Sequence, residues 1–323
     1  MTTYELMLSI APDKSVTAMH VAVGVITDNL GNILLTQRAK HVHQGGLWEF
    51  PGGKLELGES VEQALLRELQ EEVGILVELA APLIKVRHDY GDRCVLLDVW
   101  RVSRFSGQAT ACEGQSMCWL SADRLGELSF PAANFPIVKA AQLPDFYAIV
   151  EGQTVEEVLR NCRCILQRGI KLLQLRIKSL SVAEVEFVVP RILSICQQQQ
   201  VKLLINSDLA FATKLGDGIH FTSRALLACQ TRPKNYTWVA ASCHNLAELK
   251  HAEQLGIDFA VLAPVQSTTT HPGQQPLGWD QVSDWIDQVN LPVYVMGGLS
   301  MGDLHRSFVA GAQGVAGISA FLD

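Results

Sequence analysis

The sequence predicts two domains: a mixed α+β domain over residues 1–142, and a (β/α)8 TIM barrel over residues 143–323 whose last helix is truncated. Three observations support this prediction. A chain of 323 residues is long for one core, since domains usually hold roughly 100–200 residues. The first part shows no regular alternation of strands and helices. After about Leu143, eight short apolar runs alternate with helix-like segments, as in barrels.

The composition excludes several classes of protein. No stretch approaches the roughly 20 consecutive apolar residues that span a bilayer, and the N-terminus lacks a basic region, so we expect no membrane span and no signal peptide. The net charge of −7 argues against a nucleic-acid binder. The eight Cys residues lack CxxC spacing, which is typical of reduced thiols that pack as small hydrophobes, and we expect a cytoplasmic protein.

The first domain begins with a predicted hairpin over residues 18–40, in which HVAVGVIT and ILLTQR flank a turn. A glycine-rich segment, QGGLWEFPGGK, precedes a predicted helix from about Ser60 to Val73. Ser60 followed by Gln63 is typical of a capping box, and Gly74 is typical of a C-cap. Further strands are expected at residues 83–90 and 93–102, followed by an acidic loop around Glu113.

The predicted helix gathers acidic residues on one face. Glu68, Glu71 and Glu72 stand at i, i+3 and i+4, so their side chains project together. The adjacent face is apolar and would be buried: Leu65, Leu69 and Val73. Crowded carboxylates repel one another, and a divalent cation such as Mg²⁺ or Mn²⁺ would remove that cost. Arg67 can orient Glu71, and Glu59 can join the cluster from the preceding loop.

The spacing from Gly53 to Ile75 is the Nudix box, G-x5-E-x7-R-E-U-x-E-E-x-G-U with U a bulky aliphatic residue, and the domain resembles the Nudix hydrolases. The resemblance implies Mg²⁺-dependent hydrolysis of a phosphoanhydride, in which a carboxylate removes a proton from the attacking water. It implies Glu68 as general base, with Arg67 and Glu71 as the other catalytic residues. The implied metal ligands are the Gly53 carbonyl, Glu59, Glu68, Glu71, Glu72 and Glu113.

Features outside the box resemble the MutT family of 8-oxo-dGTP diphosphatases over residues 18–140. The run WEFPGGK matches the family closely, Glu113 falls where the family brings a loop carboxylate to the metal, and Asn134 falls at its base-recognition Asn. The resemblance implies cleavage of 8-oxo-dGTP to 8-oxo-dGMP and pyrophosphate, which protects DNA from mutation. The implied substrate-binding residues are Arg38, Glu49, Phe50, Gly52, Lys54 and Asn134.

The chemistry of an amide suits this base. Guanine oxidised at C8 carries a hydrogen on N7 beside the O6 acceptor, and Asn134 offers the complementary oxygen and NH₂ group. A site built on such a hydrogen bond can reject the wrong analogue by roughly 10⁴–10⁵. Simpler interpretations remain for three residues: Asn134 as a turn residue that caps local backbone, Glu113 as a surface acid and Arg38 as a surface cation.

The second domain resembles the thiamin phosphate synthase and TenI-like barrels. Gln174, Arg176 and Lys178 alternate along one predicted strand, so they would share a face that could bind a pyrophosphate. Glycines follow the seventh and eighth predicted strands, the usual phosphate site of such barrels. The implied ligand-site residues are Gln174, Arg176, Lys178, Asn206, His244, Thr268, Thr270, Gly298 and Ser319.

Departures from the synthase pattern make synthase activity doubtful. The two Mg²⁺ aspartates of the synthases align with Ser207 (or Asp208) and with Ala225, and the family's lysine is His271 here. TenI-like proteins lack that metal site, and some isomerise a thiazole phosphate with a His at the position of His244. A structural His at this position is the alternative.

Three interpretations of the whole chain follow. The first is hydrolysis of an oxidised nucleoside triphosphate beside a TenI-like barrel. The second ties both domains to thiamin, with the Nudix site clearing a damaged thiamin-type diphosphate and the barrel acting on a thiazole or thiamin phosphate. The third makes the barrel a non-catalytic phosphate-binding or dimerisation module. The truncated last helix leaves a flank for the first domain or, in a homodimer, a second subunit.

Overall fold

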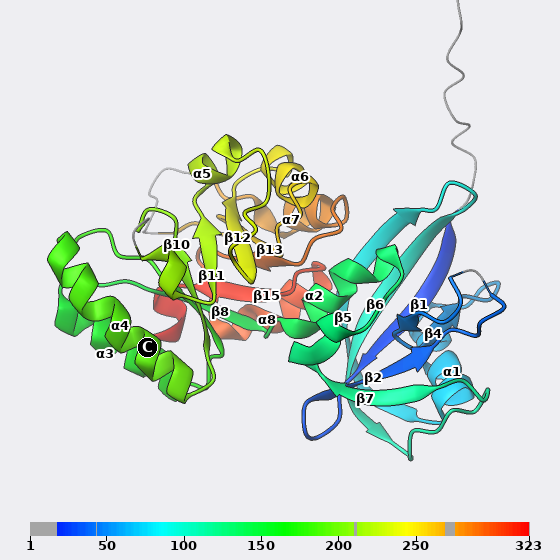
Figure 1. The fold of residues 1–323 in the computed structure, drawn as a ribbon. Helices are drawn as coiled ribbons and strands as arrows, with labels where there is room; N and C mark the ends of the chain where they lie inside the picture. The colour runs from blue at the N-terminus through cyan, green and yellow to red at the C-terminus, as the bar shows by residue number, and fades with distance from the viewer. Residues whose placement is uncertain (1–17, 43, 210–211, 269–274, 323) are drawn as a thin grey trace, which may run out of the picture.

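The computed structural model describes residues 18–42, 44–209, 212–268 and 275–322, which form the two predicted domains (Figure 1). The N-terminal domain contains a four-stranded mixed sheet, ordered β4-β1-β6-β5, and a three-stranded sheet, ordered β3-β2-β7. Its strands are β1 (Met19–Ile26), β2 (Asn32–Gln37), β3 (Trp48–Glu49), β4 (Gly52–Lys54), β5 (Leu76–Asp89), β6 (Cys94–Ser106) and β7 (Met117–Ser121). Its helices are α1 (Val61–Val73) and α2 (Phe135–Gln142), with 3-10 turns η1 (Ala122–Glu127) and η2 (Ala132–Asn134).

The predicted hairpin over residues 18–40 is wrong. Strand β1 pairs with β4 and β6, whereas β2 pairs with β3 and β7 in the other sheet. A single bridge between Thr27 and Ile33 links the two strands. The reason is that both edges of β1 already have partners, and the Asp28 side chain, which accepts the Leu30 and Asn32 N–H groups, turns the chain toward the second sheet.

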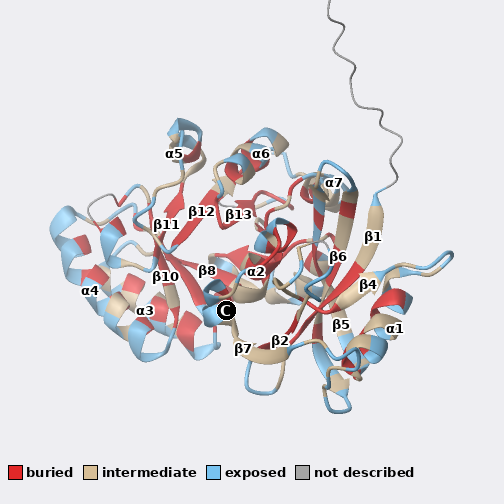
Figure 2. Cartoon of the chain, turned by 45° about the vertical axis from the view of Figure 1, so that its right-hand side comes forward, coloured by how far each residue is buried: buried red, intermediate tan, exposed pale blue. Residues whose placement is uncertain are grey.

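Helix α1 matches its prediction closely. The Ser60 side chain accepts the Gln63 N–H, the Gln63 side chain accepts the Ser60 N–H, and Gly74 ends the helix in the left-handed conformation with φ 69°. The predicted apolar face is buried: Ala64, Leu65, Leu69 and Val73. This burial, seen as the red part of α1 in Figure 2, fixes the rotation of the helix and brings Glu68 to Gly53 of β4.

The C-terminal domain is a closed barrel of eight parallel strands, and each of the eight predicted apolar runs forms one strand. The strands are β8 (Phe146–Val150), β9 (Leu172–Leu175), β10 (Lys202–Asn206), β11 (Gly218–Phe221), β12 (Trp238–Cys243), β13 (Phe259–Leu262), β14 (Val293–Val295) and β15 (Gly314–Gly317). The helices are α3 (Val155–Gln167), α4 (Val182–Gln198), α5 (Ser223–Ala228), α6 (Leu246–Gln254), α7 (Gly278–Ile286) and α8 (Leu304–Val309), with turns η3 (Thr213–Leu215) and η4 (Met301–Asp303).

The last barrel helix is reduced to the turn η5 (Ser319–Phe321), as predicted. Phe321 is fully buried and packs on Phe146, with ring centroids 5.7 Å apart, so the barrel itself fills part of the flank left by the missing helix. The first domain contacts the barrel at helix α8, which precedes β15 and packs on β5.

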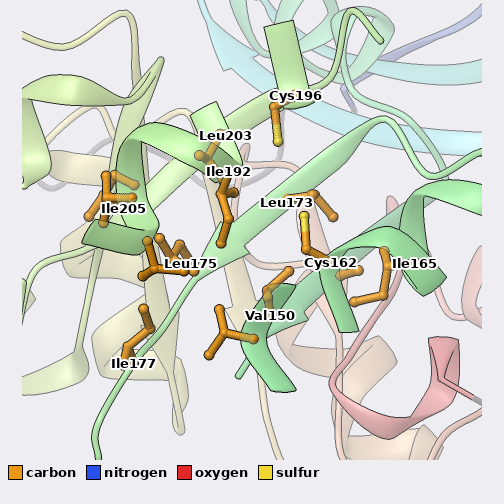
Figure 3. Close-up of a cluster of buried hydrophobic side chains, with 14 of the residues drawn as sticks. Val150, Cys162, Ile165, Leu173, Leu175, Ile177, Ile192, Cys196, Leu203 and Ile205 are labelled. Atoms are coloured by element: carbon orange, nitrogen blue, oxygen red, sulfur yellow. The ribbon is translucent and has the colours of Figure 1, made fainter. Parts of the chain in front are cut away.

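The prediction that the thiols pack as small hydrophobes holds for three buried cysteines, Cys162, Cys196 and Cys243, whereas Cys112 is exposed. All eight cysteines are free, and Cys162 and Cys196 lie among Ile and Leu side chains between helices α3 and α4 and the barrel wall (Figure 3). In the described parts of the chain, no helix is both long and apolar enough to cross a membrane.

Candidate active sites

Arg67 is the centre of the acidic face of α1. Its guanidinium donates to Glu59 from Nε and Nη2 at 2.9 Å, to Glu68 at 2.8 Å and to Glu71 at 3.2 Å. The hydrogen bonds from Arg67 hold the pKa of Glu59 below its usual range. Arg67 therefore gathers three of the predicted metal ligands in one cluster and compensates their charge.

Glu72 lies apart from this cluster, on the side of α1 that faces the loop of Glu113. Its Oε2 atom accepts the Gly52 N–H at 2.8 Å, and its carboxyl is largely enclosed. Burial raises the pKa of Glu72, and the nearby charge of Glu113 raises this pKa further. These two residues line one cleft of about 300 Å³ together with Arg38 and Glu49. The predicted loop carboxylate thus lies beside the Nudix-type helix.

The backbone of β4 is shaped to let carboxylates approach. A Cβ atom on Gly53 would lie 2.1 Å from the carboxyl carbon of Glu68, and one on Gly52, where φ is 150°, would lie 2.1 Å from the Ala22 carbonyl oxygen. Glycine is therefore required at Gly53 for Glu68 to reach the strand, and at Gly52 for β4 to lie against β1. Carboxylate and carbonyl oxygens packed this closely form the donor set that hard divalent cations prefer.

The carboxylates are not already arranged around a single point. Within the described residues, no three His, Cys, Asp or Glu side chains converge as a ready-made metal site. The reason is visible in the contacts of Arg67, which hold Glu59, Glu68 and Glu71 in ion pairs. A cation that bound here would have to draw carboxylates from Arg67, so the residues fit a metal by their chemistry and require local rearrangement to hold it.

A cavity of about 340 Å³ lies beside the acidic face, and it brings together all the predicted substrate-binding residues. These are Arg38, Glu49, Phe50, Gly52, Lys54 and Asn134. Arg38 forms an ion pair with Glu49, and burial raises the pKa of Glu49 in spite of that partner. Phe50 is 3% exposed and stacks on Phe130 with centroids 5.8 Å apart, which gives the cavity an aromatic wall.

Asn134 is 7% exposed and lines this cavity from the end of η2. Its side chain makes no capping hydrogen bond to α2, which begins at the next residue. The simpler interpretation as a local cap therefore lacks its expected contact.

Sequence reasoning missed Tyr90 and Arg93, which also line the cavity. Their position at the β5–β6 turn, beside a strand of alternating apolar residues, was the available signal.

In the barrel, most predicted ligand-site residues line one cavity of about 280 Å³ at the C-terminal ends of the strands. They are Gln174, Arg176, Asn206, His244, Thr268, Gly298 and Ser319. The prediction that Lys178 shares a strand face with Gln174 and Arg176 is wrong, because β9 ends at Leu175 and Lys178 points to solvent. Thr270 and His271 lie outside the described residues.

The floor of the barrel cavity is a connected chain of neutral polar groups. Asn206 donates to Gln174 at 2.9 Å, Gln174 donates to the Tyr147 hydroxyl at 3.3 Å, and that hydroxyl lies 3.0 Å from Nδ1 of His220. His220 Nε2 in turn lies 2.9 Å from the Ser242 hydroxyl. Burial lowers the pKa of His220 to about 3, so the ring is neutral over the physiological range.

Tyr147, His220 and Ser242 were not predicted as site residues. The signal for two of them was present, since Tyr147 and His220 are polar rings inside short apolar strands, FYAIV and GIHF. His244 lies at the rim, where its Nδ1 atom is 2.8 Å from the Ala263 carbonyl oxygen, so Nδ1 carries the proton and Nε2 is left as an acceptor.

The barrel cavity differs from a metal–diphosphate site. No Asp or Glu belongs to its described lining, and Arg176 pairs with Glu151. Ser207 accepts the Thr222 N–H through its hydroxyl, Asp208 is exposed away from the cavity, and Ala225 offers no ligand atom. Gly297 and Gly298 line the cavity after β14 and adopt positive φ values of 105° and 68°, which side chains rarely allow.

Two family models match the chain. The NUDIX domain model covers residues 22–140, and the thiamine monophosphate synthase model covers residues 146–321. An 8-oxo-dGTP diphosphatase of Escherichia coli is 41% identical over 120 residues, which are 37% of this chain and 93% of that protein. A CTP pyrophosphohydrolase of the same organism is 37% identical over 122 residues, 38% of this chain and 90% of that protein. A thiamine-phosphate synthase of Herpetosiphon aurantiacus is 30% identical over 181 residues, 55% of this chain and 88% of that protein.

Proposed function

The chain belongs to the Nudix hydrolases over residues 22–140 and to the thiamine monophosphate synthase family over residues 146–321, and we propose that its N-terminal site hydrolyses 8-oxo-dGTP. The observation that carries the proposal is the enclosed position of Asn134 in the cavity beside α1. The 41% identity to an 8-oxo-dGTP diphosphatase supports it.

The residues of α1 have separate tasks in this proposal. Glu68, Glu71, Glu72 and Glu113 would hold Mg²⁺, with the Gly53 carbonyl, after Arg67 releases Glu68 and Glu71. When bound, the cation would neutralise phosphate oxygens and make water more acidic. Glu68 would accept the proton of the attacking water, and the Gly52 N–H would keep Glu72 in position. The products would be a nucleoside monophosphate and pyrophosphate.

The base would be recognised by a matched pair of hydrogen bonds. The Asn134 oxygen would accept N7–H of the oxidised base, and its NH₂ group would donate to O6. Unmodified guanine has no hydrogen on N7, so two acceptors would face each other in an enclosed cavity. Phe50 and its neighbour Phe130 would provide the apolar wall against which a base packs.

The experiment that tests this proposal is the steady-state kcat/KM with Mg²⁺ for 8-oxo-dGTP, dGTP, CTP and thiamin diphosphate. We expect a preference for 8-oxo-dGTP over dGTP of at least about 10³, which Asn134→Ala lowers by roughly 100-fold. Asn134→Asp is the matched control, since it keeps an acceptor and loses the donor. Equal rates for both guanine nucleotides, or fastest cleavage of CTP or of thiamin diphosphate, would contradict the proposed substrate.

For the barrel we propose a site for a thiazole phosphate or a related small phosphate ester that binds without Mg²⁺. The absence of carboxylates from its described lining favours a TenI-like role over synthase activity. Nε2 of His244 would serve as the acid–base group, and the glycines after β14 would bind the phosphate. Calorimetric titration with thiazole phosphate should give the same affinity with Mg²⁺ and with EDTA. Metal-dependent binding, with formation of thiamin phosphate and pyrophosphate once the pyrimidine diphosphate co-substrate is added, would favour synthase activity instead.

A further inference from the structure

Helix α2 joins the nucleotide cavity to the N-terminal end of the barrel. It begins at Phe135, directly after Asn134, and ends at Gln142, four residues before strand β8. Figure 1 shows it between the two sheets and the N-terminal ends of the barrel strands. A displacement of this short helix would therefore move Asn134, the residue proposed to recognise the base.

Gln313 of the barrel holds the last turn of α2. Its side chain is 1% exposed, and Nε2 donates to the carbonyl oxygens of Ala140 at 3.1 Å and of Leu143 at 3.0 Å. The Ala140 carbonyl also accepts the Leu143 N–H at 3.3 Å, so Gln313 adds a second donor to this carbonyl and ties the last turn of α2 to the barrel. The Oε1 atom of Gln313 has no partner among the described residues, which leaves these two bonds as the evident use of the side chain.

An ion pair with a buried carboxylate also anchors α2 to the barrel. Lys139 of α2 lies 2.8 Å from Asp258, whose side chain is 3% exposed and also receives Arg232 at 2.6 Å and the Val239 N–H at 2.7 Å. The Lys139 ammonium also lies 4.9 Å from the centre of the Trp238 ring. Because two further donors hold Asp258, removal of Lys139 would not leave a bare buried charge in the barrel.

The chain after α2 is anchored in the barrel interior. Leu143 is 4% exposed and packs in the cluster formed by the rings of Tyr147, Phe259 and Tyr294, and the Tyr294 hydroxyl donates to the Pro144 carbonyl. The barrel thus contacts the C-terminal end of α2 through side chains and through the chain itself.

We propose that the N-terminal end of the barrel is a structural part of the nucleotide site, and that Gln313 and Lys139 are positioning residues for Asn134. The proposal rests on the proposed function only in the identity of the base. It assigns the barrel a role that needs no reaction in its own cavity. It also gives the covalent connection between the two domains a structural role, since a free barrel would hold α2 only transiently.

The test is Gln313→Met, which keeps the volume and removes both bonds to α2. Its global stability should fall somewhat, because the two buried carbonyls lose this donor even though the unpaired Oε1 atom disappears as well. We expect KM for the best-cleaved nucleoside triphosphate to rise about tenfold, as a loss of roughly one hydrogen bond predicts, with kcat within about twofold. Backbone amides of residues 132–142 should exchange their hydrogens faster. KM should change more than kcat because Glu68, the proposed base, lies on α1. This helix packs on β1 and β4, so the base should keep its position when α2 is displaced.

Asn290→Ala is the matched control. Asn290 also makes two hydrogen bonds across the domain interface, accepting the Arg87 N–H at 2.7 Å and donating to the Arg87 carbonyl at 3.0 Å, but these hold β5. KM and exchange at residues 132–142 should stay at wild-type values. Equal KM changes in both variants, or no change in Gln313→Met, would overturn the proposal.

Lys139→Met and Lys139→Arg provide a second measurement if Gln313→Met does not fold. The Met variant should raise KM, and the Arg variant should restore it, because Arg can still pair with Asp258. An Arg variant no better than Met would overturn the proposal. A wild-type enzyme without preference for 8-oxo-dGTP would refute the proposed substrate alone, since KM and exchange are measured with whichever triphosphate is cleaved best.

Discussion

The N-terminal site and the barrel site treat charge in opposite ways. The N-terminal site gathers Glu59, Glu68 and Glu71 around Arg67. On another side of α1, Glu72 faces Glu113 of the loop before β7. The barrel cavity has a floor of neutral groups, and no carboxylate belongs to its described lining. The difference supports the two proposals, that the first site binds a divalent cation and that the second binds a phosphate ester without one.

The largest effect should come from Glu68. Glu68→Gln keeps the size of the side chain and removes the base, so kcat with Mg²⁺ should fall by about 10²–10⁴-fold. The measurement is the release of pyrophosphate from 8-oxo-dGTP. Binding of thiazole phosphate to the barrel should be unchanged, because this substitution leaves the barrel's own polar chain intact. A fall in kcat of less than about tenfold would indicate that another glutamate is the general base.

The second effect concerns the neutral floor of the barrel. The pKa of His220 is lowered from 6.5 to about 3 by burial, so between these values the unfolded chain binds a proton that the folded chain does not. Stability from this group is fully present above pH 6.5 and falls as the pH drops, by up to about 1.4 kcal/mol per pH unit. Urea unfolding of the wild type and of His220→Gln, from pH 7 to pH 4.5, measures the difference.

The His220→Gln curve should be flatter over that window, since Gln cannot take up a proton in the unfolded state. Its amide can still bond to Tyr147 or to Ser242, which limits the loss at pH 7. Parallel curves would show that His220 titrates normally and that the floor of the cavity is wetter than its burial indicates.

The success of the sequence predictions follows how local each feature is. The capping box of Ser60, the buried face of Leu69 and the end at Gly74 lie within one helix, so spacing alone was sufficient. The eight barrel strands were found because each is a continuous apolar run bounded by polar residues. The hairpin failed because strand pairing is decided by distant partners, namely β4 and β6 for the strand that ends at Ile26.

The missed site residues depend on closure of the barrel. Tyr147 and His220 are 73 positions apart, and only the closed arrangement of strands brings the hydroxyl to the ring nitrogen. Lys178 was assigned to the cavity because alternation was extended beyond the true end of β9 at Leu175. The contacts of Gln313 with α2 were beyond sequence reasoning for the same reason, since they join residues 170 or more positions apart.

The smallest effect should be a gain in stability at the N-terminal site. Burial and the neighbouring Glu113 raise the pKa of Glu72, so its ionised form costs free energy in the folded protein at pH 8. Glu72→Gln removes that charge and keeps an acceptor for the Gly52 N–H, so without divalent cations its Tm should rise by about 2 °C. Below pH 4.5, where both folded and unfolded carboxyls are protonated, the difference should vanish.

Addition of Mg²⁺ should raise the Tm of the wild type more than that of the variant, because only a bound cation compensates the buried carboxylate. A variant less stable than the wild type even with EDTA would mean that the Glu72 carboxylate is held by the fold itself, and that this site needs a cation for catalysis but not to offset its own charge.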